Sequence, residues 1–377
     1  MSDWTSTRLG DTVEFIKNGT TATQLKIKSP KLVTRIETIA DGEVNLRKAG
    51  FVAESENIER YRLTTGDILF SHINSIKHIG KTALIRSDDE IYNGMNLLQI
   101  RPNRARAYSS FLLEVLRSEG FRSEVRSRAK QAVNQASISI AQLQELEILL
   151  PPLPEQKKIA EILSGIDKQI LSVKSEIQQA QKISTAVTKE LIASIQDESL
   201  PLSEVAINHD STRVPIKSEE RARRKGPYRY YGASGVIDTI DDFLFDGDYI
   251  LVGEDGANII DRNKPLAFKV SGKFWVNNHA HIIQPRESCD INFLTYYLES
   301  LDYTGIASGS AQPKITRSAL DAIQVPVPAL EVQKKIGVVI ESTIDMATTA
   351  EKKEKKLIDL KQALSADLLS GHKRVSV

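Results

Sequence analysis

The chain has 377 residues and a formal net charge of +1, with 50 basic residues against 49 acidic ones. At roughly 150 residues per domain this length predicts two domains. The even charge balance excludes a uniformly basic nucleic-acid coat but leaves local basic patches open. A single cysteine, Cys289, excludes an intramolecular disulfide and favours a reducing cytoplasm. The first residues lack the pattern of a signal peptide, and no apolar run approaches membrane-spanning length.

The first half of the chain, about residues 1–150, predicts a small sheet with few helices. Short apolar runs at 67–70, 81–85 and 96–100 predict strands, and residues 109–120 predict a helix. Glycine, asparagine and aspartate turns separate these runs, which is typical of a twisted, mostly antiparallel sheet. The regular alternation of strand and helix found in Rossmann folds does not occur in this pattern.

A long helix follows. Apolar residues recur at spacings of three and four from Glu155, just after Pro154, and fade around Asp197. They form one apolar stripe over about five heptads. A helix of this length spans roughly 60 Å at 1.5 Å per residue, which is too long for packing on one small core.

The second half predicts the same sequence of elements. Runs at 249–252, 264–270 and 281–283 predict strands, and residues 292–301 predict a helix. A second long helix, expected at about 330–370, would end at a C-cap glycine, Gly371. Two helices with one apolar stripe each bury those stripes most simply against each other, as an antiparallel pair. The alternative is that each helix packs on its own globular half.

The sequence itself contains an internal repeat. Residues 135–159 align with residues 312–336 without a gap, and both copies contain the tetrapeptide Gln-Lys-Lys-Ile, at 156–159 and 333–336. Weaker similarity links upstream segments, such as Gly-Asp-Ile-Leu at 66–69 and Gly-Asp-Tyr-Ile further on. We therefore predict an internal duplication in which both halves carry the same elements in the same order.

The sequence offers little for catalysis. Gly80, Lys81 and Thr82 resemble the end of a phosphate loop, but Ser75 stands where that loop needs a glycine. His279 and His281 alternate on a predicted strand and would point the same way, yet a third metal ligand is not evident, so hydrogen-bonding roles are favoured over a metal site. Cys289, without a paired histidine, is interpreted as an ordinary residue.

Two basic clusters are candidate DNA contacts, because guanidinium forks and tyrosine hydroxyls bind phosphates and base edges. The alternative for each is a solvated loop. The cluster in the second half interleaves cations with tyrosines: Arg221, Arg223, Arg224, Lys225, Tyr228, Arg229, Tyr230 and Tyr231. The candidates in the first half are Lys77, His78, Lys81, Arg122, Arg126 and Arg128.

Residues 150–160, Leu-Pro-Pro-Leu-Pro-Glu-Gln-Lys-Lys-Ile-Ala at the start of a long helix, resemble the specificity subunit of type I restriction–modification enzymes. Residues 230–235, Tyr-Tyr-Gly-Ala-Ser-Gly, and residues 277–280, Asn-Asn-His-Ala, add to the resemblance. The second copy departs from the motif, since one residue separates Glu331 from Gln333.

The resemblance implies an α+β fold with two target-recognition domains, two long helices forming an antiparallel coiled coil, and a pseudo-twofold axis. The corresponding boundaries are 1–150 for the first recognition domain, 151–198 for the first helix, 199–328 for the second recognition domain, and 329–377 for the second helix and the tail. Each domain would read one part of a split double-stranded DNA target, with Asn278 and His279 added to the candidate DNA contacts.

The resemblance also implies partners. Two methyltransferase subunits would dock on the helices, and motor–nuclease restriction subunits would join them. The chain would be non-catalytic and cytoplasmic, with S-adenosylmethionine, ATP and magnesium on the partner subunits. The residues expected to bind partners lie in the repeated motif: Glu155, Gln156, Lys157, Lys158, Gln333, Lys334 and Lys335. Two other functions stay open at this point, a coiled-coil adaptor that organises proteins without touching DNA, and a stand-alone enzyme.

Overall fold

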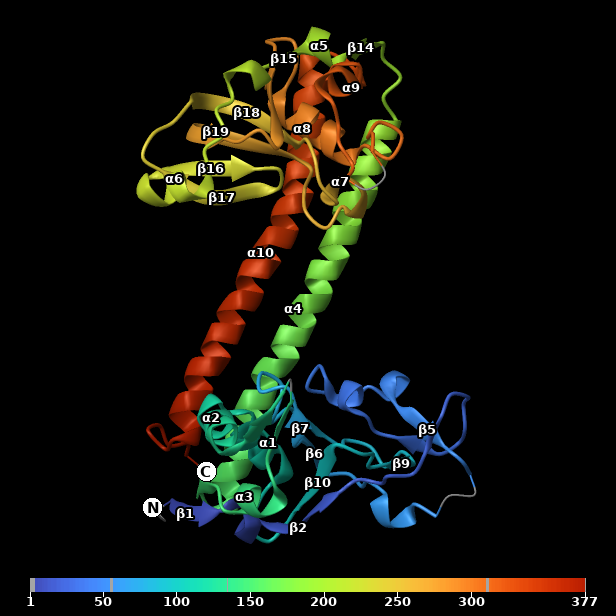
Figure 1. Ribbon diagram of the computed structural model, residues 1–377, viewed down its shortest axis with the longest axis vertical. Coiled ribbons are helices and arrows are strands. Elements are labelled where there is room, and N and C mark those ends of the chain that lie inside the picture. Colours follow the sequence, from blue (N-terminus) through green and yellow to red (C-terminus); the bar gives the residue numbers. More distant parts are fainter. Residues whose placement is uncertain (1–3, 55–56, 134, 310–311, 377) are drawn as a thin grey trace. The chain divides into compact units, whose positions relative to one another are not determined.

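The computed structural model describes residues 4–54, 57–133, 135–309 and 312–376 (Figure 1). The chain forms two compact units, Met1–Ser172 with Glu354–Val377, and Val173–Lys353. Each long helix contributes to both units, so the units cut across the segments expected from sequence. Within the described residues, no helix combines the length and apolarity needed to cross a membrane.

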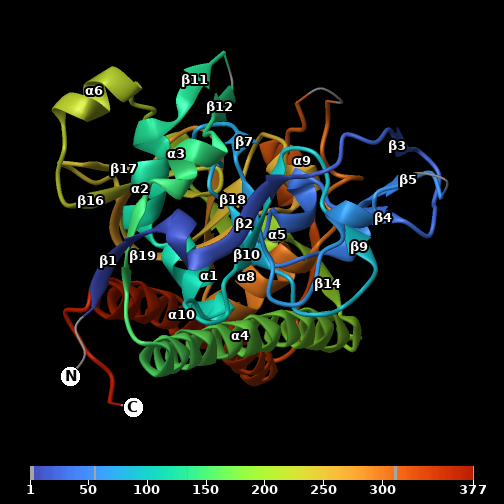
Figure 2. The same ribbon diagram turned by 90° about the horizontal axis from the view of Figure 1, so that it is seen from below.

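The core of the first unit is a four-stranded antiparallel sheet in the order β2-β10-β6-β8, whose β2 and β10 are visible side by side in Figure 2. Three smaller sheets surround it, and all pairs except β4–β9 are antiparallel. The strands are β1 (Thr5–Arg8), β2 (Val13–Asn18), β3 (Gln24–Leu25), β4 (Leu32–Val33), β5 (Gly50–Val52), β6 (Ile68–Ser71), β7 (Ile73–Asn74), β8 (Thr82–Leu84), β9 (Ile91–Tyr92), β10 (Leu97–Pro102), β11 (Lys130–Ala132), β12 (Gln135–Ser137) and β13 (Glu147–Leu150).

The helices of the first unit's globular part are α1 (Ser109–Arg117), α2 (Glu119–Arg128) and α3 (Ile140–Gln144). The single helix expected over 109–120 is therefore wrong in its end. The backbone of Ser118 is extended, with φ −60° and ψ 146°, and its hydroxyl accepts a hydrogen bond from the Phe121 amide. This N-cap stops α1 and starts α2 in a new direction, since a serine side chain that satisfies an amide of the next turn favours helix initiation.

The second unit contains a six-stranded sheet in the order β15-β20-β18-β19-β16-β17, in which only the β16–β19 pair is parallel. The strands are β14 (Ser199–Pro201), β15 (Ala206–Asn208), β16 (Tyr228–Gly232), β17 (Gly235–Ile240), β18 (Phe245–Gly253), β19 (Ala267–Val276), β20 (Ala280–Pro285) and β21 (Gln324–Pro326). The short helices are α5 (Leu202–Val205), α6 (Ser218–Arg223), α7 (Asn258–Asp261), α8 (Ile291–Ser300) and α9 (Arg317–Asp321).

The two units repeat one topology, which confirms the predicted duplication. The order β2-β10-β6-β8 in the first unit matches β15-β20-β18-β19 in the second. The flanking pair β1–β13 matches β14–β21, and α1 after β10 matches α8 after β20. Each unit then carries its own insertion: β3, β4, β5 and β9 in the first, and α6, β16 and β17 in the second. The mostly antiparallel α+β fold expected from sequence is confirmed.

The long helices are α4 (Leu153–Ala193) and α10 (Leu330–Leu369), close to the expected bounds. In the first unit they run antiparallel, because Asp167 pairs with Lys361 (2.6 Å) while Glu155, earlier on α4, pairs with Arg374 beyond the end of α10. In the second unit they also run antiparallel, since Glu176 pairs with Lys353 (3.3 Å) and Ser184 contacts Thr343.

The helices also pack on the globular parts, so both expected arrangements occur together. In the first unit, Ile159 and Leu163 of α4 and Leu368 of α10 are buried in the same cluster as the sheet and α1. In the second, Ile336 and Ile340 of α10 pack with Phe293 of α8, and side chains from the end of α4 cover them. Gly371, with φ of 75°, lies just past α10 in the left-handed conformation that a C-cap glycine adopts.

Candidate nucleic-acid interface

The basic cluster of the second half lies on α6 and on β16, at one end of the six-stranded sheet (Figure 1). Three of its cations are held by carboxylates of the neighbouring hairpin. Arg221 and Lys225 both pair with Asp238, and Arg224 pairs with Asp241 at 2.9 Å. The Lys225 ammonium lowers the pKa of Asp238 to about 2, with help from the Thr239 amide and Arg221. These three cations therefore fix α6 on the hairpin and have less charge to offer a ligand.

Two cations of this cluster stand out because they are exposed and, unlike the exposed Lys225, have no carboxylate partner in the described structure. Arg223 ends α6, and Arg229 lies on β16. Within the described parts of the chain, neither side chain has a hydrogen bond or an ion pair. A guanidinium without a carboxylate partner is free to bind a phosphate or a guanine edge. Arg223 and Arg229 are therefore the strongest phosphate candidates in the second half.

The tyrosines of the same segment are mainly core residues. Tyr230 is 0% exposed, and its hydroxyl accepts a hydrogen bond from the Ile216 amide. Tyr231 is 6% exposed and packs edge-on against Phe274. Tyr228 is half-buried against Phe243. The prediction that Tyr230 and Tyr231 contact DNA is therefore wrong, because both side chains are buried. They are successive residues of β16 and point to opposite faces of the sheet, where each packs in a different hydrophobic cluster.

Asn278 and His279 lie in the turn between β19 and β20, and both are exposed. The His279 ring is held by Asp255, with Nδ1 at 2.8 Å from one carboxylate oxygen. His279 precedes β20, whereas His281 is inside the strand and 1% exposed, so the expected common orientation of the two rings is wrong. The turn offers an amide and an imidazole edge to a ligand, while His281 faces the interior.

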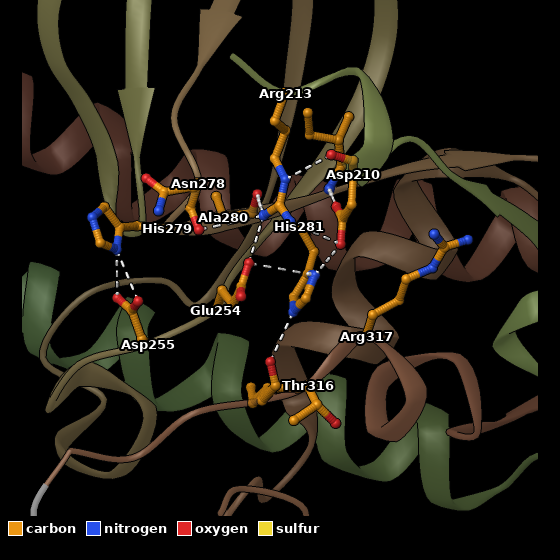
Figure 3. Close-up of polar contacts among 12 residues, drawn as sticks. Asp210, Arg213, Glu254, Asp255, Asn278, His279, Ala280, His281, Thr316 and Arg317 are labelled. Carbon is orange, nitrogen blue, oxygen red and sulfur yellow. Dashed lines mark hydrogen bonds and ion pairs between the residues drawn. The ribbon is translucent and has the colours of Figure 1, made fainter. Parts of the chain in front are cut away.

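Beneath this turn lies a buried charged cluster, which we define as Asp210, Arg213, Glu254 and His281 (Figure 3). Nδ1 of His281 is 2.6 Å from Asp210, and Nε2 is 2.9 Å from the carbonyl oxygen of Ile315. Nη1 of Arg213 donates to Glu254 at 2.5 Å. Lys314 reaches the other oxygen of Glu254 at 3.0 Å.

The electrostatics of the cluster favour charged carboxylates. Burial acts to raise the pKa of Asp210, but hydrogen bonds from His281 and the Ile282 amide, with the nearby Arg213, bring that pKa below its ordinary value. Burial likewise opposes ionisation of Glu254, yet Arg213 and Lys314 lower its pKa. The sequence did not predict this cluster, because its members lie far apart along the chain and only His281 was a candidate residue.

Three residues of this cluster have side chains of the kinds that bind metal ions. Asp210, Glu254 and His281 offer ligand atoms that lie within 4.8 Å of one another. However, Arg213 and Lys314 already neutralise these carboxylates, and both ring nitrogens of His281 face oxygen acceptors. A metal would have to displace a guanidinium from its ion pairs, so the arrangement fits an ion-paired core better than a metal centre.

The basic residues predicted in the first half gather around α2. Lys77 and His78 are exposed in the turn after β7, and Gly80 in that turn lies against the stem of Arg122 and against Val125. Arg126 and Arg128 pair with Glu119 and Glu124 on α2 itself, and Lys81 donates to the carbonyl of Ala40. Lys77 and His78 are therefore the candidates with the most freedom to meet a ligand in this half.

Arg122 has an unusual environment. Burial, and then the neighbouring Arg117, lower the pKa of its guanidinium, and its Nε is buried without a hydrogen-bond partner in the described structure. It lines a cavity of about 880 Å³ within the first unit, together with Glu114, Asp167 and Lys361. Because the charges of this lining nearly balance, the cavity gives no selective reason for Arg122 to bind a DNA phosphate.

The residues expected to bind partners divide into two groups. Glu155, Gln156 and Gln333 are buried, with exposures of 4%, 0% and 0%. The lysines of the motif are exposed, and they are Lys157, Lys158, Lys334 and Lys335. Only the lysines are therefore placed to meet another protein directly, and the three buried residues are corrected to structural roles.

The two glutamines have matching roles in the two units. Gln156 accepts a hydrogen bond from the Tyr108 amide, before α1, and donates to the carbonyls of Arg106 and Pro151. Gln333 accepts from the Asp290 amide, before α8, and donates to the carbonyls of Ser288 and Pro328. Each glutamine thus ties the start of a long helix to the start of a globular helix, and a buried amide with all three contacts is well satisfied.

Glu155 joins the first turn of α4 to both ends of the chain. It accepts hydrogen bonds from Arg374 at 2.7 Å and from the Trp4 indole at 3.1 Å. Arg374 lowers the pKa of Glu155, although burial opposes this.

Burial raises the pKa of the Cys289 thiol to about 12, which leaves almost no thiolate near neutral pH and agrees with its interpretation as an ordinary residue.

Comparisons with known proteins give these surfaces a context. The sequence model described as "Type I restriction modification DNA specificity domain" matches residues 1–182 and 198–360. A protein of Methanocaldococcus jannaschii, named as a putative type I restriction enzyme MjaX specificity subunit, is 33% identical over 99% of this chain and 94% of its own length.

Solved structures share the fold. The crystal structure of a type I restriction-modification S subunit from M. genitalium superposes with a TM-score of 0.64 at 18% identity, over 97% of this chain and 96% of that one. A chain from a study of complex assembly and conformational transition in a type I R-M system gives 0.61 at 17% identity, over 97% of each chain. Two matches of one family model cover both repeated halves, and a relative matches almost end to end. The chain therefore belongs to the type I restriction–modification DNA specificity family.

Proposed function

We propose that this chain reads a split double-stranded DNA sequence, one block with each globular half, as the specificity subunit of a type I restriction–modification complex. The duplicated topology carries this proposal: the same sheet order, β2-β10-β6-β8 and β15-β20-β18-β19, occurs twice with different insertions. Two related modules with different surfaces suit two different half-sites. Each half also has its own exposed cations, Lys77 in the first and Arg223 and Arg229 in the second.

The same duplication supports a scaffolding role. Lys157 and Lys158 on α4 recur as Lys334 and Lys335 on α10, and all four are exposed. Two equivalent surfaces on one chain suit two copies of one partner, which we propose to be methyltransferase subunits, with motor–nuclease subunits joining for cleavage. In this proposal the partners bind S-adenosylmethionine, ATP and magnesium, the present chain carries no catalytic centre, and the complex acts in the cytoplasm.

Salt dependence of DNA binding tests the DNA contact. Each phosphate neutralised contributes about −0.9 to the slope of log affinity against log salt for B-DNA. Replacing Arg223 and Arg229 together by alanine should weaken binding by the assembled complex and make this slope shallower by about two, because two phosphate contacts are lost. The measurement is a fluorescence-anisotropy titration at several salt concentrations.

The matched control replaces Lys352 and Lys355, two exposed lysines of α10, by alanine, which removes the same charge outside the basic cluster. This control should keep the wild-type slope. Equal effects of both double variants would show that overall charge acts alone. A wild-type complex whose affinity does not depend on salt would overturn DNA recognition and favour the protein adaptor.

A further inference from the structure

The buried charged cluster has an arrangement that relates it to the exposed turn carrying Asn278 and His279. Arg213 comes from the segment after β15, Glu254 directly follows β18, and His281 lies on β20. Their side chains meet under the end of the sheet from which this turn projects (Figure 3). A cluster that joins three strands at the base of one turn can set the position of that turn.

Arg213 is the member that contacts both the backbone of the turn and the carboxylates of the cluster. Nη1 donates to the backbone carbonyl of Ala280 at 2.9 Å and approaches that of Asn278 at 3.4 Å. Nε donates to the carbonyl of Asp210 at 3.1 Å, and Nη2 lies 3.4 Å from the carboxylate of Asp210. The guanidinium therefore holds the backbone of the turn itself, whereas its carboxylate partners hold the guanidinium.

The rest of the turn is tied to the same place. The Glu254 amide donates to the carbonyl of His279 at 2.9 Å, and Asp255 holds the His279 ring. Asn277 accepts from the His279 amide with its side chain at 2.8 Å. The two exposed side chains thus have a fixed backbone under them, which is what precise readout of a base edge requires.

The corresponding part of the first half is held differently. There the turn before β10 is fixed by uncharged groups. The Thr34 hydroxyl accepts a hydrogen bond from the Gly94 amide at 2.9 Å, and the Asn93 side chain donates one to the carbonyl of Leu97 at 3.1 Å. A change to Arg213 therefore acts on one half of the molecule and leaves an internal reference in the other.

We infer that Arg213 is a positioning residue for sequence readout: it fixes the turn at Asn278 and His279 so that this turn reads bases in the block recognised by the second half. The inference rests on the proposed function. It differs from a general contribution to stability, because a planar guanidinium can contact three backbone carbonyls and two carboxylates at once, whereas a lysine ammonium on a flexible stem cannot.

The test uses Arg213→Lys, which keeps the charge among the carboxylates but not the fork. The assembled complex is incubated with a randomised duplex DNA library, and the bound molecules are sequenced. Arg213→Lys should relax preference in one block by about tenfold, the loss expected for one base contact of about 1.4 kcal/mol, and leave the other block unchanged. His279→Ala, an exposed change with little risk to folding, should relax the same block.

The double variant separates positioning from independent effects. If Arg213 acts through the turn, combining it with His279→Ala should relax the block no further than the larger single change. Thermal unfolding of Arg213→Lys is followed in parallel, and its discrimination is compared at a temperature where the variant is folded. Wild-type discrimination in Arg213→Lys, relaxation of both blocks, or additive effects with His279→Ala would each overturn the inference. A wild-type complex that selects no sequence would instead overturn the proposed function.

Discussion

Single residues in this chain show how burial decides between two roles that a sequence motif leaves open. The Gln-Lys-Lys-Ile tetrapeptide occurs twice and carries the family resemblance. Its glutamines are buried and satisfy backbone groups, while its lysines are exposed. Neighbouring residues of one motif therefore divide into buried and exposed positions, because successive positions of a helix point in different directions.

Replacing Gln156 by alanine should destabilise the first unit. The Tyr108 amide and the carbonyls of Arg106 and Pro151 would lose their partners in a buried place, which costs about 1–3 kcal/mol. Urea unfolding of the full chain measures this, with Lys157→Ala as the exposed neighbour that should change stability little. Equal stability of both variants would contradict the structural role of Gln156.

The buried charged cluster predicts a loss of stability in acid. Asp210 and Glu254 have lowered pKa values in the folded state, so the unfolded chain takes up their protons first as the pH falls. Their contribution is present above the ordinary carboxyl pKa values of about 4 and is lost as the pH falls through the lower folded values. The double variant Asp210→Asn, Glu254→Gln should therefore show a shallower fall of melting temperature between about pH 4.5 and pH 3.

Each variant in that experiment is compared with its own melting temperature near neutral pH, so that a general loss of stability does not enter. Glu155, whose pKa Arg374 also lowers, remains in both proteins and serves as the background. A wild-type chain and a double variant with parallel acid profiles would show that the cluster does not contribute protons to acid unfolding.

At the scale of elements, the long helix α4 has one buried face and one exposed face. The start of α4 is part of a globular core, with Leu163 at 0% exposure, whereas Leu171 two turns later is 62% exposed. Leu171 lies off the apolar stripe, whose neighbouring members Ile170 and Val173 are 9% and 2% exposed. What differs is the packing, since Leu163 contacts the cluster that includes α1 and the end of α10.

This difference gives a matched comparison within one helix. Leu163→Ala should destabilise the first unit by about 2–5 kcal/mol, because it leaves a cavity in a packed core. Leu171→Ala should change stability by less than about 0.5 kcal/mol, because the leucine is mostly in solvent and helix propensity is preserved. Chemical unfolding followed by circular dichroism checks both values, and similar losses would contradict the buried position of Leu163 and the exposed position of Leu171.

For the whole molecule, the duplication predicts modular recognition. Each unit has its own sheet and its own buried clusters. Changes in the insertion of one half should therefore leave the folding of the other half intact. The insertions differ completely, with a four-stranded sheet in the first unit and the α6–β16–β17 segment in the second.

Exchanging residues 1–150 for the equivalent domain of another family member should change one block of the DNA target and leave the other block and the gap unchanged. The readout is the set of methylated sites produced by the assembled complex, mapped by sequencing that detects methyladenine. The block recognised by the second half should stay the same as in the original protein, and it serves as the internal control. Loss of both blocks in a folded, assembled complex would contradict modular readout.

The sequence by itself determined the repeat, the two long helices, three of the four strands in each copy of the duplicated sheet, and the family. These depend on local pattern: the spacing of apolar residues, the turn-forming glycines, and four identical residues in register. The tertiary structure decided which polar residues are available. Asp210, Arg213, Glu254 and His281 meet only because three strands converge. Likewise Tyr230 is buried in the core and Arg221 forms an ion pair with Asp238, while Arg223 and Arg229 are exposed. Burial and ion pairing depend on contacts between distant segments, and a linear pattern does not contain those distances.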